Sequence, residues 1–276
     1  MNGISRVLQE KEKLACITLD FELDYGDRTG AFDILEDKAH LAELSTLFSA
    51  LDIPVSAFIR TDILIDYPQA LAVVKALARD YHGHSHTHDT RAFDSRFELE
   101  TSASTFESVF GYRPLGYRAP QGVLRDGDID LLKALGYKFS ASVFPAYRPG
   151  KFNNRSLPIS PFLYDNGIME LPFAVVPTLR SVISLSYLKL LGMGMNKAFF
   201  AMFGLPDIVV FDSHLHDFIL SEASFNKLPL SLKTAWGVRK HSGIRYFEIF
   251  VELLRTRGYR FITMTELYHH LARKVA

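Results

Sequence analysis

The sequence predicts an α/β fold in which helices cover a parallel sheet or barrel. Short apolar runs alternate along the chain with segments whose apolar residues recur at helical spacing, and this alternation is typical of parallel α/β folds. Charged residues and histidines follow several of the apolar runs directly. Because parallel α/β folds place ligand-binding and catalytic groups at strand ends, both observations favour the same architecture.

The predicted strands are short. Residues 14–19 (Leu-Ala-Cys-Ile-Thr-Leu) form an almost wholly apolar run, which is typical of a strand buried on both faces. A further strand is expected to begin or end at the histidine-rich segment 82–88, and another to start at residue 114 and lead into a loop. The remaining expected strands are 54–59, 137–143, 208–211 and 258–262.

The predicted helices lie between these strands. In the segment 37–51, leucine and phenylalanine recur at helical spacing. Gly111 and Gly136 are suited to end the helices that precede them. The other expected helices are 68–79, 97–110, 128–135, 245–257 and 265–273. Residues 145–170 are rich in Pro, Asn, Ser and Gly, so we expect a loop there.

Length and charge limit the classes of protein that fit. The 276 residues suffice for one large α/β domain with a substantial core, and we expect a single domain over residues 1–276. The 31 basic and 31 acidic side chains balance. Without a global basic field, no nucleic-acid partner is expected. The single cysteine, Cys16, excludes an intramolecular disulfide.

The sequence shows no sign of secretion or of a membrane span. The first 14 residues are polar and charged and lack the apolar core of a signal peptide. No run reaches the roughly 18 unbroken apolar residues that a spanning helix needs. We therefore expect a cytoplasmic protein.

The segment 171–206 is unusually apolar. It consists mainly of Leu, Phe, Val, Met, Tyr and Gly, and its only charges are Arg180, Lys189 and Lys197. One interpretation is a buried pair of helices. The other is an insertion that faces lipid or gates the substrate, with peripheral membrane contact.

Four of the ten histidines fall within residues 82–88. Neutral imidazole is the commonest metal ligand in proteins, and two histidines four residues apart can converge on one ion. Two interleaved pairs have this spacing, His82 with His86 and His84 with His88. The alternative interpretation is a solvated, histidine-rich loop.

Other titratable residues follow the predicted strands. Acids come after the strand at 14–19, histidines come after the strand at 208–211, and an arginine lies in the loop near 118. A carboxylate and two histidines would leave open positions on a divalent ion, as in catalytic sites. Such an ion polarises a carbonyl and lowers the pKa of water. A spare carboxylate could accept that water's proton, and a late histidine could protonate a leaving amine.

The order of these motifs resembles the polysaccharide deacetylase family, also called the NodB-homology or carbohydrate esterase family, over residues 14–270. Residues 18–22 (Thr-Leu-Asp-Phe-Glu) match its acidic motif in the Asp-x-Glu form of one branch. Residues 84–88 match its His-x-x-x-His motif, and residues 118–122 (Arg-Ala-Pro-Gln-Gly) match its Arg-x-Pro-x-Gly motif. Its final Leu-x-His motif is looser here, and His214 and His216 both compete for it.

The resemblance implies a distorted (β/α) barrel with fewer than eight full strands and metal-dependent hydrolysis of a non-peptide C–N bond. It implies zinc as the metal, with cobalt or manganese as alternatives. The roles carried over by position are a general base at Asp20, metal ligands at Glu22, His84 and His88, an arginine partner of the base at Arg118, and a general acid at His216 with His214 as the alternative. Asp24 is a substitute ligand.

The expected substrate is an N-acetylated or N-formylated amino sugar. The cytoplasmic expectation and the apolar insertion at 171–206 favour a sugar carried on a lipid or a nucleotide. A first alternative is an amidohydrolase that acts on a small non-sugar amide. A second is a non-catalytic protein that binds a metal or a sugar with the same fold.

Overall fold

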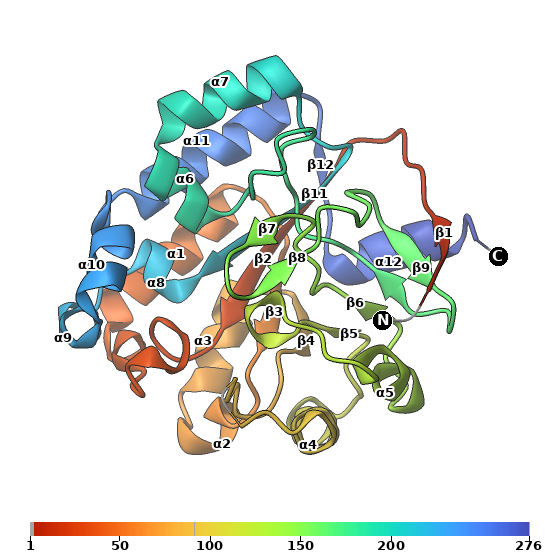
Figure 1. Ribbon diagram of the computed structural model, residues 1–276. Helices are drawn as coiled ribbons and strands as arrows, with labels where there is room; N and C mark the ends of the chain where they lie inside the picture. The colour runs from red at the N-terminus through yellow and green to blue at the C-terminus, as the bar shows by residue number, and fades with distance from the viewer. Residues whose placement is uncertain (1–2, 91, 276) are drawn as a thin grey trace.

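One mixed sheet forms the centre of the protein, and helices pack around it (Figure 1). The computed structural model describes residues 3–90 and 92–275. The strand order is β1-β9-β10-β6-β5-β4-β3-β2-β11, with β12 also paired to β2. The strands from β6 to β11 in this order are parallel to their neighbours, and β9 runs antiparallel to β10 and β1.

The strands are β1 Ile4–Val7, β2 Leu14–Phe21, β3 Val55–Ile59, β4 Asp80–Gly83, β5 Gly116–Tyr117, β6 Phe139–Ser140, β7 Tyr147–Arg148, β8 Phe152–Asn153, β9 Phe162–Tyr164, β10 Met169–Glu170, β11 Ile208–His214 and β12 Arg260–Phe261. Strands β7 and β8 form a separate antiparallel hairpin.

The helices are α1 Lys38–Ala50, α2 Ile63–Asp66, α3 Ala70–Leu77, α4 Ser95–Phe110, α5 Asp128–Ala134, α6 Leu185–Leu191, α7 Met193–Phe203, α8 Leu215–Phe218, α9 Glu222–Lys227, α10 Leu230–Gly237, α11 Gly243–Thr256 and α12 Met264–Ala272. Short 3-10 helices occupy Gly26–Arg28, Asp33–Glu36 and Pro120–Gly122.

Strand β2 is the central element, and all eight of its residues are buried. Its side chains alternate between two packing layers, as the pleat requires. Ile17 and Leu19 join the core that contains residues of α1 and α11, whereas Leu14 and Cys16 join the core that contains residues of α12. Asp20 is separated from Leu14 and Cys16 by an even number of positions, so its side chain lies on the same face of β2 as theirs. It therefore points to the interior at the carboxyl end of the strand.

The opening between β6 and β11 is bridged by residues 171–174. The Leu171 N–H donates to the Ser140 carbonyl at 2.8 Å, and the Phe173 N–H donates to the Val143 carbonyl at 2.9 Å. On the other side, the Ala174 N–H donates to the Val210 carbonyl at 3.0 Å. These single bonds, in place of a regular ladder, agree with the distorted barrel that the motifs imply.

Most predicted elements are present, and their ends follow local chemistry. The Asp37 side chain accepts the His40 N–H and begins α1, as expected for an N-cap residue. Gly111 ends α4 with a φ of 79°, in the left-handed region that favours glycine. The expectation of a loop at 145–170 is wrong, because that segment contains the hairpin β7–β8 and the strands β9 and β10.

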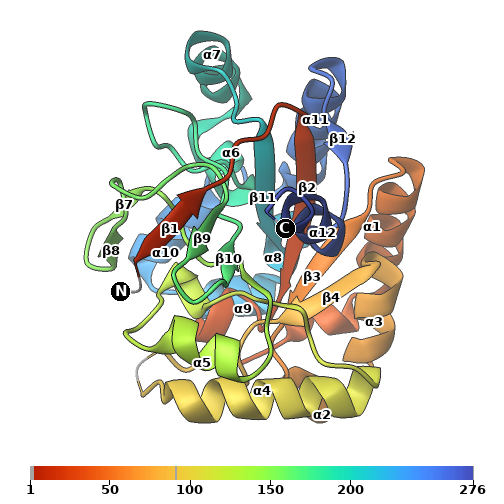
Figure 2. The same ribbon diagram turned by 90° about the vertical axis from the view of Figure 1, so that its right-hand side faces the viewer.

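The segment 171–206 combines a buried layer with an exposed one. Residues 171–176 are buried, and α6 and α7 then lie beside α11 (Figures 1 and 2). Leu185, Leu188 and Phe200 face the core, which agrees with the interpretation as a buried helix pair. The outer side of these helices exposes large apolar residues, namely Tyr187, Leu190, Met195 and Met202. Within residues 3–90 and 92–275, no helix is long and apolar enough to cross a membrane.

Candidate active site

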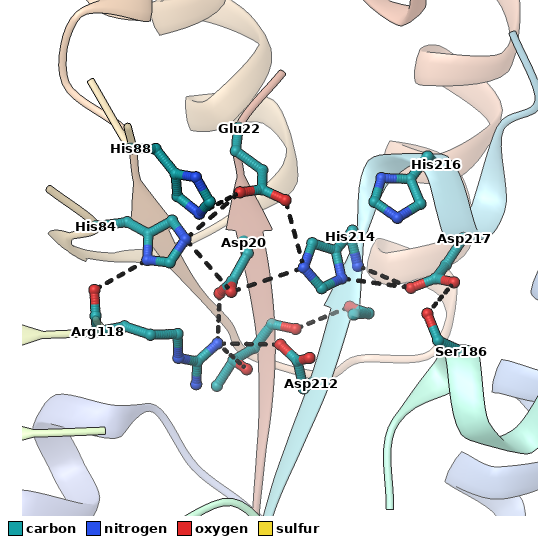
Figure 3. A network of polar contacts seen from close by, with 12 residues as sticks. Asp20, Glu22, His84, His88, Arg118, Ser186, Asp212, His214, His216 and Asp217 are labelled. Carbon is teal, nitrogen blue, oxygen red and sulfur yellow. Dashed lines mark hydrogen bonds and ion pairs between the residues drawn. The ribbon is translucent and has the colours of Figure 1, made fainter. Parts of the chain in front are cut away.

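The predicted site residues converge on one cavity at the carboxyl ends of β2, β4 and β11 (Figure 3). The cavity has a volume of about 570 Å³, within the range of small-molecule sites. Its floor is polar and its outer wall carries aromatic and basic side chains. The lining includes Asp20, Glu22, His84, His88, Arg118, Asp212, His214 and His216.

Glu22, His84 and His88 form a compact set of metal-ligand atoms, all within 4.8 Å of one another. Glu22 Oε2 lies 3.0 Å from His88 Nε2 and 3.5 Å from His84 Nε2. His84 Nδ1 lies 2.9 Å from the Arg118 carbonyl oxygen. Because a carbonyl only accepts, Nδ1 carries the proton and the Nε2 lone pair faces the cluster.

The donor set fits a divalent ion. Two imidazoles and one carboxylate are the protein ligands of open, catalytic zinc sites. Burial raises the pKa of the Glu22 carboxyl group, but His88 and His84 outweigh it and hold that pKa well below its usual range. A charged carboxylate beside two imidazoles is the protonation state that metal binding requires.

The loop after β4 is shaped to bring the two candidate ligand histidines together. Ser85 and His88 have φ values of 62° and 60°, a left-handed conformation that non-glycine residues seldom adopt outside constrained sites. The buried Glu98 on α4 accepts the His86 N–H at 2.7 Å and the Thr87 N–H at 2.8 Å. Glu98 therefore supports this loop, a role that the sequence pattern did not reveal.

The other histidine pair of the cluster does not converge. His82 Nε2 contacts Asp80 Oδ2 at 2.9 Å, and the His82 ring packs on Phe58. His86 Nδ1 lies 3.0 Å from Thr61 Oγ1. Of the two pairs in this cluster, only His84 and His88 join a set of candidate ligands among the described residues.

Arg118 is buried and holds two carboxylates. Its Nη1 contacts Asp20 Oδ1 and lies 3.2 Å from Asp212 Oδ1. The same nitrogen donates to Thr18 Oγ1 at 2.9 Å, and Nε donates to the Ala141 carbonyl at 3.1 Å. This arrangement fixes one oxygen of Asp20 and leaves Oδ2 facing His84 and His214, each 3.8 Å away.

The Arg118 guanidinium also packs between two aromatic rings. Its central carbon lies 3.9 Å from the centroid of the Phe58 ring and 4.4 Å from that of Phe173. Cation–π contacts of this kind are strongest when water is excluded, and the Arg118 side chain is 1% exposed. Stacking and hydrogen bonds together define one orientation for this arginine.

Asp212 is a site residue that the motif comparison did not identify. It lies in β11 beside the Arg118–Asp20 pair, and burial together with the Asp20 charge raises its pKa to about 7. Its signal in the sequence is an acid directly after the apolar run 208–211, the same pattern that identified Asp20.

The structure places the two candidate acid histidines differently. His214 Nε2 lies 3.5 Å from Glu22 Oε1 and 3.8 Å from Asp20 Oδ2, and its side chain is 23% exposed. His216 lies behind it, between the rings of Tyr25 and His214, with centroids 4.6 and 4.8 Å away. His216 Nδ1 accepts the Tyr25 N–H at 3.2 Å.

The pKa values of these histidines move in opposite directions. Burial lowers the pKa of His214, but Asp212, Asp217, Glu22 and Asp20 outweigh burial and raise it well above its usual value. Burial, with a smaller contribution from the His214 charge, lowers the pKa of His216 to about 3. His214 is therefore the protonated member of the pair near neutral pH.

Asp217 holds His214 in place and is itself held by α6. Asp217 Oδ2 accepts the backbone N–H of His214 at 3.1 Å and lies 3.6 Å from the ring nitrogen Nδ1 of the same residue. Ser186 Oγ donates to Asp217 Oδ1 at 2.7 Å (Figure 3). Lys189 Nζ lies 3.6 Å from the same oxygen. The apolar segment 171–206 thus supplies a partly buried hydroxyl and a buried cation that position the histidine.

Asp24 lies apart from the candidate ligands. Its Oδ2 accepts the Ser224 hydroxyl at 2.8 Å and the Ile34 N–H at 3.3 Å. Burial raises its pKa to about 6. Asp24 stabilises the segment around the cavity and does not join the group formed by Glu22, His84 and His88.

Comparison with known proteins agrees with this geometry. No family model and no curated protein sequence matches the chain, but solved structures do. A Mycobacterium smegmatis protein assigned as a polysaccharide deacetylase has a TM-score of 0.62 at 14% identity, over 99% of this chain and 96% of that one. The chain has the fold of the family 4 carbohydrate esterases. The resemblance found in the motifs is therefore confirmed by structure.

Two further neighbours show the range of this esterase fold. A peptidoglycan N-acetylglucosamine deacetylase has a TM-score of 0.53 at 11% identity, over 93% of this chain and 88% of that one. A pseudoenzyme of the family from Bacillus anthracis has a TM-score of 0.54 at 12% identity, over 94% of this chain and 66% of that one. Because the esterase fold occurs in both, activity must be argued from the residues of the site.

Proposed function

We propose that the protein is a metal-dependent hydrolase that removes an N-acetyl or N-formyl group from an amino sugar. The observation that carries the proposal is the convergence on one cavity of a ligand set, a carboxylate held by an arginine, and a protonated histidine. Sugar deacetylases among the structural neighbours support the substrate class.

In the proposed reaction, Glu22, His84 and His88 hold the metal. When bound, a divalent ion would polarise the acyl carbonyl and lower the pKa of a water molecule. Asp20 accepts the proton of the attacking water through Oδ2, because Oδ1 is held by Arg118. The water oxygen bonds to the acyl carbon, the C–N bond breaks, and the amine leaves with a proton.

We assign the general acid to His214. Its raised pKa keeps it protonated, and its Nε2 faces Asp20 and Glu22 on the open side of the site. The motif comparison favoured His216 for this role, but the ring of His216 packs behind His214, and its lowered pKa leaves it neutral. In our proposal His216 is a packing partner that keeps His214 in position.

The nitrogen-rich ligand set favours zinc, with cobalt or manganese as alternatives. For the substrate we propose an amino sugar linked to a lipid or a nucleotide in the cytoplasm. The aromatic side chains of Tyr25 and Trp236 in the cavity wall suit the apolar faces of a sugar ring. The apolar outer side of α6 and α7 supports peripheral contact with a membrane.

The test is a panel of N-acetyl and N-formyl amino sugars, free, nucleotide-linked and lipid-linked, assayed with zinc, cobalt or manganese for released acetate or formate. The D20N variant is the control for contaminating activity. Product from at least one sugar is expected. Bound metal and sugar without product would favour the non-catalytic binder, and product only from small non-sugar amides would favour the amidohydrolase.

A further inference from the structure

Among the described residues, three cations of the cavity lining have no acidic partner. Arg28, Arg148 and Lys151 line the cavity with exposed side chains. Within residues 3–90 and 92–275, none of the three takes part in an ion pair. The carboxylates of the lining lie at the floor, apart from Asp89, which has an interaction of its own.

Two of these cations are carried on the hairpin β7–β8, which crosses in front of the strand ends in Figure 1. The hairpin is anchored by stacked rings. Phe144 stacks on Phe152 at 6.0 Å and on Phe173 at 3.7 Å between centroids, and Phe173 also packs on Arg118. The Asn154 N–H donates to the Ala146 carbonyl at 2.9 Å. The anchor sets the position of Arg148 and Lys151 relative to the catalytic floor.

The lining carries carboxylates as well as cations, but Asp20, Glu22 and Asp212 are buried at the floor, whereas Arg28, Arg148 and Lys151 are exposed. Exposed cations that line a cleft raise the local concentration of anionic ligands, and a neutral sugar would make no use of them. Arginine binds phosphate oxygens in a bidentate fork, and lysine binds them as a point charge. A diphosphate ester carries enough negative charge and enough oxygens to engage more than one cation at once, whereas a single carboxylate would not need them.

We infer that Arg28, Arg148 and Lys151 form an anion subsite that binds a phosphate or diphosphate ester attached to the amino sugar. The inference rests on the proposed function for the orientation of the substrate, with the N-acyl group at the floor and the ester at the mouth. Another wall of the cavity carries the exposed aromatic ring of Tyr187 on α6. That wall receives what the ester carries, which is either a nucleoside or a lipid chain.

The test compares the double variant R148A/K151A with R245A, which removes an exposed arginine on α11 outside the cavity. Both are assayed on N-acetylglucosamine, its 1-phosphate, its uridine diphosphate ester and a short-chain alkyl diphosphate ester. Charge-assisted hydrogen bonds contribute about 1.5–3 kcal/mol, so kcat/KM of the double variant should fall about 10–100-fold on the phosphorylated sugars. It should stay within about twofold on the neutral sugar, where no such bond is lost.

Several results would overturn the subsite. Equal loss on neutral and phosphorylated sugars would indicate damage to the site, and no loss on any phosphorylated sugar would show that the cations do not bind it. Within the phosphorylated set, a larger loss on the uridine ester identifies a nucleotide carrier, and a larger loss on the alkyl ester identifies a lipid carrier. R245A should behave like the unmodified protein throughout.

A binding measurement separates this inference from the proposed function. Inorganic pyrophosphate is titrated calorimetrically into the protein as purified, into R148A/K151A and into R245A. Weaker binding by the double variant alone supports the subsite, even if no sugar is hydrolysed. Identical binding by all three proteins would refute it, even if the protein is an active deacetylase.

Discussion

Replacement of Arg118 by methionine tests the central pairing of the site. Methionine keeps an apolar chain between the rings of Phe58 and Phe173 but leaves Asp20 and Asp212 without their cation. Removing one partner of a buried ion pair costs about 3–5 kcal/mol. This is a large part of the roughly 5–15 kcal/mol that stabilises a domain, so R118M should fold with a clearly lower Tm.

The loss of stability in R118M should depend on pH, and Asp212 determines the direction of that dependence. Its pKa is about 7 in the folded protein, above the value of about 3.9 for a free aspartate. The folded state therefore binds more protons than the unfolded state between these values, and the contribution of Asp212 to stability falls as pH rises through that window. Arg118 is one of the charges that lower the pKa of Asp212, so its removal raises that pKa further and makes ionisation of Asp212 above pH 7 more costly. The destabilisation by R118M should therefore be larger at pH 8 than at pH 5.

The assay is urea denaturation of R118M and the unmodified protein from pH 5 to pH 8.5, with metal content and turnover measured on the same samples. Turnover should fall at least about 100-fold, because a misplaced catalytic group costs about that much. The matched control is R113M, which removes an exposed arginine paired with the exposed Glu107 and should cost no more than about 1 kcal/mol. The reasoning fails if R118M and R113M lose similar stability at every pH.

Three further predictions concern the roles of single residues. D20N should keep the metal and the fold while turnover falls about 10²–10⁴-fold. E22Q should lose metal and activity together. If metal analysis gives the reverse pattern, the roles of Asp20 and Glu22 are exchanged. H214N should reduce turnover far more than H216N does. H216N should mainly lower Tm, because His216 is packed between the rings of Tyr25 and His214. A larger loss of turnover in H216N would return the acid role to His216. L190E, at an exposed position of α6, should change the free energy of unfolding by no more than about 0.5 kcal/mol. It should weaken both sedimentation with anionic vesicles and turnover of lipid-linked sugar. Unchanged vesicle binding would remove the membrane contact from the proposal.

Position relative to strand ends explains why much of the site could be predicted from sequence. Asp20 and Glu22 follow the apolar run 14–19, and His214 ends the run that begins at residue 208. In a parallel sheet these ends meet at one edge, and the structure brings them within 3.8 Å of one another. The pattern therefore predicted where these side chains meet without any knowledge of contacts.

Spacing alone could not choose between the two interleaved histidine pairs. His82 and His86 have the same separation as His84 and His88. The choice depends on where β4 ends and on the left-handed backbone at Ser85 and His88, which are results of tertiary packing.

Buried polar partners were also out of reach of the sequence pattern. Lys189 interrupts an apolar segment that the sequence left open between a buried helix pair and an insertion that faces lipid or gates the substrate. Its side chain is 5% exposed and lies beside Asp217, a pairing that no pattern in the sequence indicated. The short strands β7 to β10 were missed because two- and three-residue strands have no detectable periodicity. Strands β9 and β10 are determined by the sheet edge that they join, and β7 and β8 by their pairing with each other.

The pairing of β2 with β11 has a consequence for how the protein is made. The Thr18 hydroxyl in β2 donates to the carbonyl of Phe211, 193 residues later in the chain. At a synthesis rate of about 5–20 residues per second, roughly 10–40 s pass between the synthesis of β2 and that of β11. Its apolar edge is open to the wrong partner strand during that interval. The three proposed metal ligands, in contrast, have all been synthesised by residue 88. The nascent chain can therefore gather an ion well before the proposed catalytic residues Arg118 and His214 are made.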